Sequence, residues 1–144
     1  MWGSLLLLLL VAGCRVAEQG GLVVESAWGR PSPQGAPAAA FYMTIVNHSG
    51  RQDAIQAVHS EACAALELHR SAMDEEGVMR MAPVPGGKID VASGESVRLE
   101  PGGLHIMCVG PPQPFAAGQE VLLTLDFEVA GSIDVAAEIR PEAP

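Results

Sequence analysis

Positively charged and aromatic side chains are scarce in this sequence. Of the 144 residues, 8 are Lys or Arg against 17 Asp or Glu, the formal net charge is -9, and aromatic residues make up 4%. Proteins that bind nucleic acid neutralise phosphates with a basic surface and often stack bases on aromatic rings. The composition therefore predicts that nucleic acid is not a partner.

A long apolar run is also lacking. Leu5–Val11 is apolar, but it is much shorter than the about 20 residues that a membrane-spanning helix needs. The run ends in Val11-Ala12-Gly13-Cys14, which resembles a bacterial lipobox. We expect residues 1–13 to be a lipoprotein signal peptide, Cys14 to carry the lipid, and residues 14–21 to form a tether.

The expected leader departs from the usual pattern, because Met1–Ser4 contains no Lys or Arg. An ordinary signal peptide with an unmodified Cys14 is the alternative. Both interpretations predict an exported protein. The lipobox interpretation also predicts that the protein is anchored by lipid on the periplasmic side of a membrane.

Cysteines are few: besides Cys14 there are only Cys63 and Cys108. An exported protein meets an oxidising compartment in which the two could pair. However, Cys108 alternates with Leu104 and Ile106, which favours a buried thiol. The sequence leaves both states open, because a disulfide needs Cα atoms within about 7 Å.

A helical period with helix caps is missing as well, whereas alternation with a period of two is frequent. Apolar residues alternate with polar ones over 121–129 and again over 133–139. This pattern is typical of half-buried strands in antiparallel sheets. Shorter β-rich segments at 22–28, 40–47, 54–58 and 65–68, separated by Gly and Pro turns, predict an all-β single domain built as a β-sandwich.

Within this β pattern, two histidines and several methionines recur at short spacings. His69 ends the segment 65–69, Met79 and Met81 are two residues apart, and His105 and Met107 follow in Leu104–Cys108. Since side chains two apart on a strand share a face, His105 and Met107 point away from the core if Ile106 points into it. Imidazole and soft thioether ligands together favour Cu(I) over Mg²⁺, Ca²⁺ or Mn²⁺.

The same residues have ordinary interpretations. A strand histidine is usually a polar surface residue, and a methionine usually fills the core. We assign His48, in a turn, and His59, without a methionine partner, to that class. No Ser-His-Asp, paired-carboxylate or phosphate-loop motif occurs, so we expect no enzymatic activity.

Several segments together resemble the periplasmic copper chaperones of the PCuAC (DUF461) family. The resemblance runs from about Leu22 to Ile139. It rests on these segments: Arg30-Pro31, Ala38–Ile45, Glu67-Leu68-His69, Gly77–Met81, Pro101–Met107 and Thr124–Phe127.

The resemblance implies a cupredoxin-like fold for residues 22–140, with 141–144 as a tail, and a Cu(I) site made by His69, Met81, His105 and Met107. Met79 is the alternative to Met81, because the spacing after His69 departs from the family pattern. It also implies a Cu(I) chaperone that delivers copper by ligand exchange to a haem-copper oxidase or its Sco-type assembly partner.

Two other functions remain as alternatives at this stage. One is a metal-free β-sandwich lipoprotein that acts as a periplasmic scaffold. The other is an electron-transfer cupredoxin, which would need a Cys thiolate beside two histidines and a weak axial Met.

Overall fold

The computed structural model describes residues 16–31 and 38–142. The expected signal peptide and Cys14 lie outside the described residues, as do residues 32–37 and 143–144. Within the described part of the chain, no helix has both the length and the apolar character needed to cross a membrane.

The regular secondary structure of the described residues consists of strands, with a single turn of 3-10 helix, η1 (Pro85–Gly87). The strands are β1 (Ala17–Gln19), β2 (Leu22–Pro31), β3 (Ala38–Asn47), β4 (Asp53–His59), β5 (Ala65–Met73), β6 (Met79–Pro83), β7 (Ile89–Val91), β8 (Ser96–Leu99), β9 (Leu104–Val109), β10 (Glu120–Phe127) and β11 (Gly131–Ile139).

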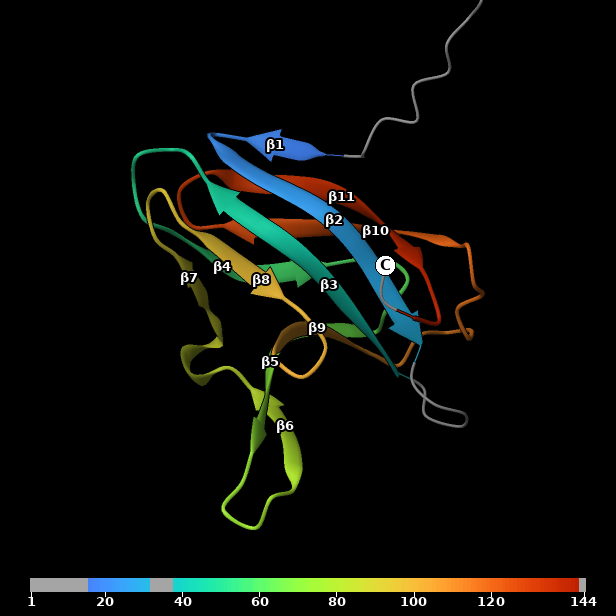
Figure 1. The fold of residues 1–144 in the computed structure, drawn as a ribbon. Coiled ribbons are helices and arrows are strands. Elements are labelled where there is room, and N and C mark those ends of the chain that lie inside the picture. Colours follow the sequence, from blue (N-terminus) through green and yellow to red (C-terminus); the bar gives the residue numbers. More distant parts are fainter. Residues whose placement is uncertain (1–15, 32–37, 143–144) are drawn as a thin grey trace, which may run out of the picture.

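These strands form one curled sheet in the order β6-β5-β9-β3-β2-β11-β10-β4-β7, with β1 beside β2 and β8 beside β3. Figure 1 shows the sheet folding over on itself, while the β5–β6 hairpin projects away from its body. The all-β, cupredoxin-like prediction is confirmed. One pairing departs from a purely antiparallel sandwich: β11 runs parallel to β2, through Glu138↔Trp28 and Ile139↔Gly29.

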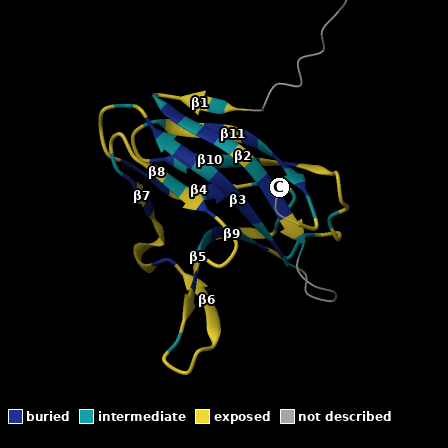
Figure 2. Ribbon diagram, viewed as in Figure 1, coloured by how far each residue is buried: buried dark blue, intermediate teal, exposed yellow. Residues whose placement is uncertain are grey.

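The core is filled by alternate residues of the long strands, as the period of two predicts. On β10 the inward residues Val121, Leu123, Leu125 and Phe127 are all buried in the core. Figure 2 shows burial concentrated in the strands of the sheet body and exposure in the β5–β6 hairpin. The remaining members of the core cluster come mainly from β2, β3, β4, β9 and β11.

Several strands differ from their expected boundaries, and two of the differences affect the tether and the candidate site. Ala17–Gln19, inside the expected tether, forms β1 and pairs antiparallel with Leu22–Val24. The strand expected at 65–68 extends to Met73, because β6 pairs with it from His69 to Met73. Pairing with β6 thus extends β5 beyond the residues whose apolar alternation predicted a strand.

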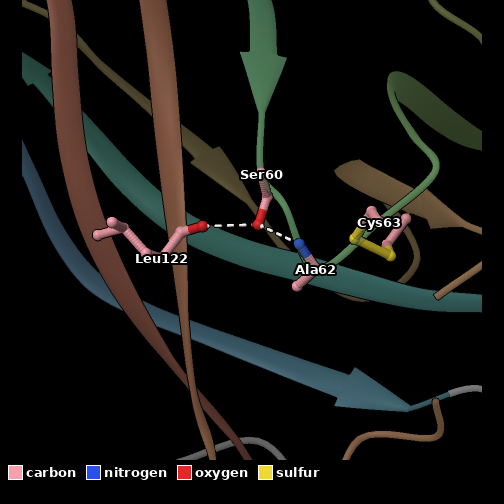
Figure 3. The surroundings of a disulfide bond; sticks show 5 residues. Ser60, Ala62, Cys63 and Leu122 are labelled. Atoms are coloured by element: carbon pink, nitrogen blue, oxygen red, sulfur yellow. Dashed lines mark hydrogen bonds between the residues drawn. A yellow bond between two sulfur atoms is a disulfide. The ribbon is translucent and has the colours of Figure 1, made fainter. Parts of the chain in front are cut away.

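Cys63 and Cys108 form a disulfide, with their Cα atoms 5.6 Å apart. The prediction that Cys108 faces the core is confirmed, since Cys108 is fully buried. The prediction that it is a free thiol is wrong, because its sulfur is bonded to Cys63. Figure 3 shows the anchoring of the β4–β5 connection beside the bridge: Ser60 Oγ donates to the Leu122 carbonyl at 2.7 Å and accepts from the Ala62 amide at 3.2 Å. This connection brings Cys63 over β9.

Candidate metal centre

The strand β9 separates core residues from candidate ligands by alternation. Ile106 and Cys108 are fully buried in the core, and Leu104 packs against it. His105 and Met107 therefore lie on the opposite, outer face of the sheet. This is the arrangement that the sequence predicts.

The strand β5 brings a second histidine directly opposite the first. His69 pairs with His105 in the β5–β9 register, and the two ring centroids are 5.8 Å apart with the rings edge to face. Glu67 pairs with Met107 in the same register, so Met107 lies one step further along this face. The structure thus gathers His69, His105 and Met107 on adjacent strands.

Each imidazole has one nitrogen anchored and one nitrogen free. His105 Nδ1 lies 3.1 Å from the Gly103 carbonyl, and His69 Nε2 lies 2.7 Å from Glu67 Oε2. Because a carbonyl and a carboxylate only accept, both anchored nitrogens carry the proton, which leaves the others with lone pairs. His105 Nε2 and His69 Nδ1 are buried and have no hydrogen-bond partner among the described residues.

This combination matches the chemistry of metal-ligating histidines, which typically donate the second ring N–H to a carboxylate or a backbone carbonyl. Buried polar atoms normally find a partner, so two unsatisfied nitrogens on facing rings call for an explanation. Nitrogens held in this way are available as metal ligands. Glu67 and Gly103 are the anchoring residues, and the sequence pattern alone did not assign them this role.

The methionines of β6 approach from the edge of the sheet. Met81 pairs with Ser71 and Met79 with Met73, so both lie on the same face as His69. Along β5, Met81 is two residues from the level of His69, roughly 7 Å, whereas Met79 is four residues away, roughly 13 Å.

The residues beside Met81 in the direction of β9 are small. Ser71 on β5 lies opposite Met81. On the side of β5 that faces β9, the Ser71 amide donates a hydrogen bond to the Gly103 carbonyl at 3.0 Å. Neither residue has a long side chain that would stand between the Met81 thioether and His105. Met81 itself is 61% exposed.

Two aromatic residues follow His105 across the sheet, first Tyr42 on β3 and then Trp28 on β2. Trp28 and Tyr42 have ring centroids 4.7 Å apart, and those of Tyr42 and His105 are 6.4 Å apart. Both rings are buried although they lie outside the main core cluster. They form an aromatic wall beside His105 on the side of β3, with Tyr42 next to His105 and Trp28 packed against Tyr42.

A β-bulge places Trp28 in this wall. The β2–β3 register shifts between Glu25↔Thr44 and Trp28↔Tyr42, so β2 holds one extra residue there. Ser26 adopts a positive φ of 56° at this point, as bulged residues often do. Without the extra residue, Trp28 would face the core.

Burial shifts the pKa values of His105 and Tyr42. Desolvation lowers the pKa of His105 below its usual value, a protonated His69 would lower it further, and the bond to Gly103 opposes both effects. Burial also raises the pKa of Tyr42, against the opposing charge and hydrogen bond of Arg30. His105 is therefore neutral at pH 7, which is the state that a metal ligand needs.

The described residues offer few other ways to hold a metal. They contain no group of three or more His, Cys, Asp or Glu side chains suited to a metal ion. Cys63 and Cys108 are paired with each other, so neither provides the thiolate of a blue-copper centre. His59 Nε2 lies 2.9 Å from Asp126 Oδ2.

A family model described as "Putative lipoprotein LpqE-like" matches residues 22–139. The chain belongs to the LpqE-like family. Among curated proteins, the putative lipoprotein Lxx21020 of Leifsonia xyli is 28% identical over 120 residues, covering 83% of this chain and 70% of the relative. The uncharacterized protein RP573 of Rickettsia prowazekii is 27% identical over 104 residues, and the match spans 56% of that protein's length.

Solved structures place this LpqE-like protein with the PCuAC domains. The apo PCuAC domain from PmoF1 superposes with a TM-score of 0.75 at 25% identity, covering 90% of this chain and 100% of that domain. The copper-bound PCuAC domain from PmoF2 gives 0.72 at 25% identity, covering 90% and 99%. The predicted membership of the PCuAC family is confirmed.

We expect metal binding by the LpqE-like protein to weaken in acid. Both histidines must be neutral to ligate, and an ordinary histidine has a pKa of about 6.5. Because burial lowers the pKa of His105 below that value, protons compete for His105 once the pH falls below it. Competition titrations with Cu(I) from pH 8 to pH 5 measure this. An affinity that stays constant to pH 5 would contradict histidine ligation.

Proposed function

We propose that this protein is an extracytoplasmic Cu(I) chaperone, anchored by a lipid on Cys14, that holds one Cu(I) at His69, Met81, His105 and Met107. The observation that carries the proposal is the pair of facing imidazoles, each with one anchored nitrogen and one buried nitrogen without a partner. The similarity to a copper-bound PCuAC domain supports it, and a lipoprotein relative supports the anchor.

The ligand types explain the choice of metal. Imidazole accepts many metals, but the neutral, polarizable thioether selects soft ions such as Cu(I). Structural zinc sites are built from Cys, His and carboxylates, and only the two histidines of this site belong to that set. The nearby carboxylate of Glu67 is already bonded to His69.

The position of the site suits transfer by ligand exchange. His105 is buried and forms the fixed inner end of the site, whereas Met81 at the outer edge is 61% exposed. Ligands of an acceptor can therefore reach the metal from the side of Met81 before His105 and His69 release it. The acceptor we propose is the copper centre of a haem-copper oxidase, or a Sco-type assembly factor.

Metal selectivity tests this function. We expect one Cu(I) to bind tightly to the purified domain and Zn²⁺ to bind at least about 100-fold more weakly, since two of four ligands are thioethers. Anaerobic competition against a chromophoric Cu(I) chelator, with a parallel Zn²⁺ titration, gives both affinities. Comparable affinities for the two ions would contradict the proposal.

The choice between Met81 and Met79 is tested with leucine, which keeps the side-chain volume and removes the sulfur. We expect Met81→Leu to lower the affinity for the first equivalent of Cu(I) by roughly 10-fold or more. The reason is that Met81 lies nearer than Met79 to the level of His69. Met79→Leu should leave the affinity for the first equivalent close to that of the wild type. If the two variants behave in the opposite way, Met79 is the ligand.

A further inference from the structure

The β5–β6 hairpin exposes an unusual amount of methionine. Met73, Met79 and Met81 are 64%, 49% and 61% exposed, although methionine is among the residues most often buried in proteins. The hairpin projects from the sheet body in Figure 1 and is coloured mostly as exposed in Figure 2. Nothing in the fold of the hairpin itself requires thioethers at these positions.

The register places the two outermost methionines as a pair. Met73 lies directly opposite Met79 near the tip of the hairpin. The Cβ atoms of directly opposed residues are about 4.5–5.5 Å apart and point to the same side. Because methionine is long, unbranched and flexible, both sulfurs can reach one ion above this pair.

The turn that joins the strands holds this pair in register. Asp74 Oδ1 accepts from the amides of Glu76 at 3.1 Å and Val78 at 2.8 Å. The Asp74 amide also donates to the Val78 carbonyl at 2.9 Å, and Arg80 pairs with the Asp74 carboxylate. By alternation, Arg80 lies on the opposite face from Met79, so its charge is directed away from the thioethers.

The charges of the tip favour a cation. Glu75 and Glu76 follow Asp74 in the turn, next to the Met73–Met79 pair, whereas the charge of Asp74 is offset by Arg80. A local excess of carboxylates raises the concentration of cations nearby. The thioethers then select a soft one.

We propose that Met73 and Met79 form a second, weaker Cu(I) site at the hairpin tip, with Met81 lying between it and the histidines. The three thioethers and His69 follow one face of the hairpin from its tip to its base. The second site is a point of entry and exit for copper bound at the base. This inference rests on the proposed function only for that role, because the tip site itself needs no histidine.

Methyl-labelled methionine NMR tests the proposal on the intact domain, with anaerobic Cu(I) added in the absence of thiols. We expect two phases. The first equivalent shifts the Met107 and Met81 methyl signals, and a second, at least about 10-fold weaker, shifts those of Met73 and Met79. Met73→Leu should abolish the second phase and keep the first. Val78→Leu, an apolar change on the other face of the same hairpin, should keep both.

A double variant, His69→Ala with His105→Ala, separates this inference from the proposed function. We expect it to lose the first phase and still bind Cu(I) weakly, with shifts at Met73 and Met79. A titration that ends at one equivalent with the Met73 and Met79 signals unmoved would overturn the second site and leave the proposed function intact. Absence of any Cu(I) binding by the wild type would overturn both.

Discussion

His105→Ala is expected to lower the affinity for Cu(I) by roughly 100-fold or more. Loss of an outer-shell partner of a metal ligand already costs 10- to 100-fold, and His105 is proposed as a direct ligand. The affinity is measured by anaerobic competition with a Cu(I) chelator. His105→Asn is a useful companion, because its amide can still donate to the Gly103 carbonyl while the Nε2 lone pair is lost.

The matched control is His59→Ala. His59 is the partner of Asp126 and is not part of the proposed site, so this variant should bind Cu(I) as the wild type does. Thermal unfolding shows whether each variant is folded, which matters because His105 is buried. A folded His105→Asn protein with wild-type Cu(I) affinity would contradict the assignment of His105.

Removal of the disulfide is expected to lower the free energy of unfolding by about 2–5 kcal/mol. The bridge joins residues 45 positions apart, and closing a loop of that length restricts the unfolded chain by about 4 kcal/mol in the chain-entropy description. The double variant Cys63→Ala with Cys108→Ala is preferred, since a single substitution leaves a free thiol that can itself bind copper.

Urea denaturation of the metal-free domain measures this loss. The loop between the two cysteines contains all four proposed ligands, from His69 to Met107. The ligands are nevertheless held in register by the β5–β9 and β5–β6 pairings. We therefore expect Cu(I) affinity to change much less than stability. Equal unfolding free energies with and without the bridge would contradict a structural role for the disulfide.

The arrangement of the ligands along each strand could be predicted, because it depends only on alternation. Once Ile106 is assigned to the core, His105 and Met107 must share the outer face. The same reasoning assigns Met79 and Met81 to one face. Which residues face one another across strands depends on register, and the turn and bulge geometry that sets register is only weakly encoded in the apolar pattern.

Two features of the structure depend on such long-range geometry and could not be settled from the sequence. The bulge at Ser26 reverses the direction of Trp28, and one extra residue in a strand leaves little trace in composition. The disulfide requires Cys63 to lie over β9, a long-range contact set by the β4–β5 connection. The anchoring of His69 by Glu67 has a visible signal in hindsight, since residues two apart on a strand are neighbours on one face.

X-ray absorption at the copper K-edge of the domain loaded with one equivalent of Cu(I) tests the central claim most directly. The account predicts an edge typical of Cu(I) and a first shell that contains both nitrogen and sulfur scatterers, two of each. In His105→Asn loaded in the same way, the nitrogen contribution should decrease while sulfur remains. A first shell of nitrogen and oxygen alone, or of sulfur alone, would contradict a site made by two histidines and two methionines.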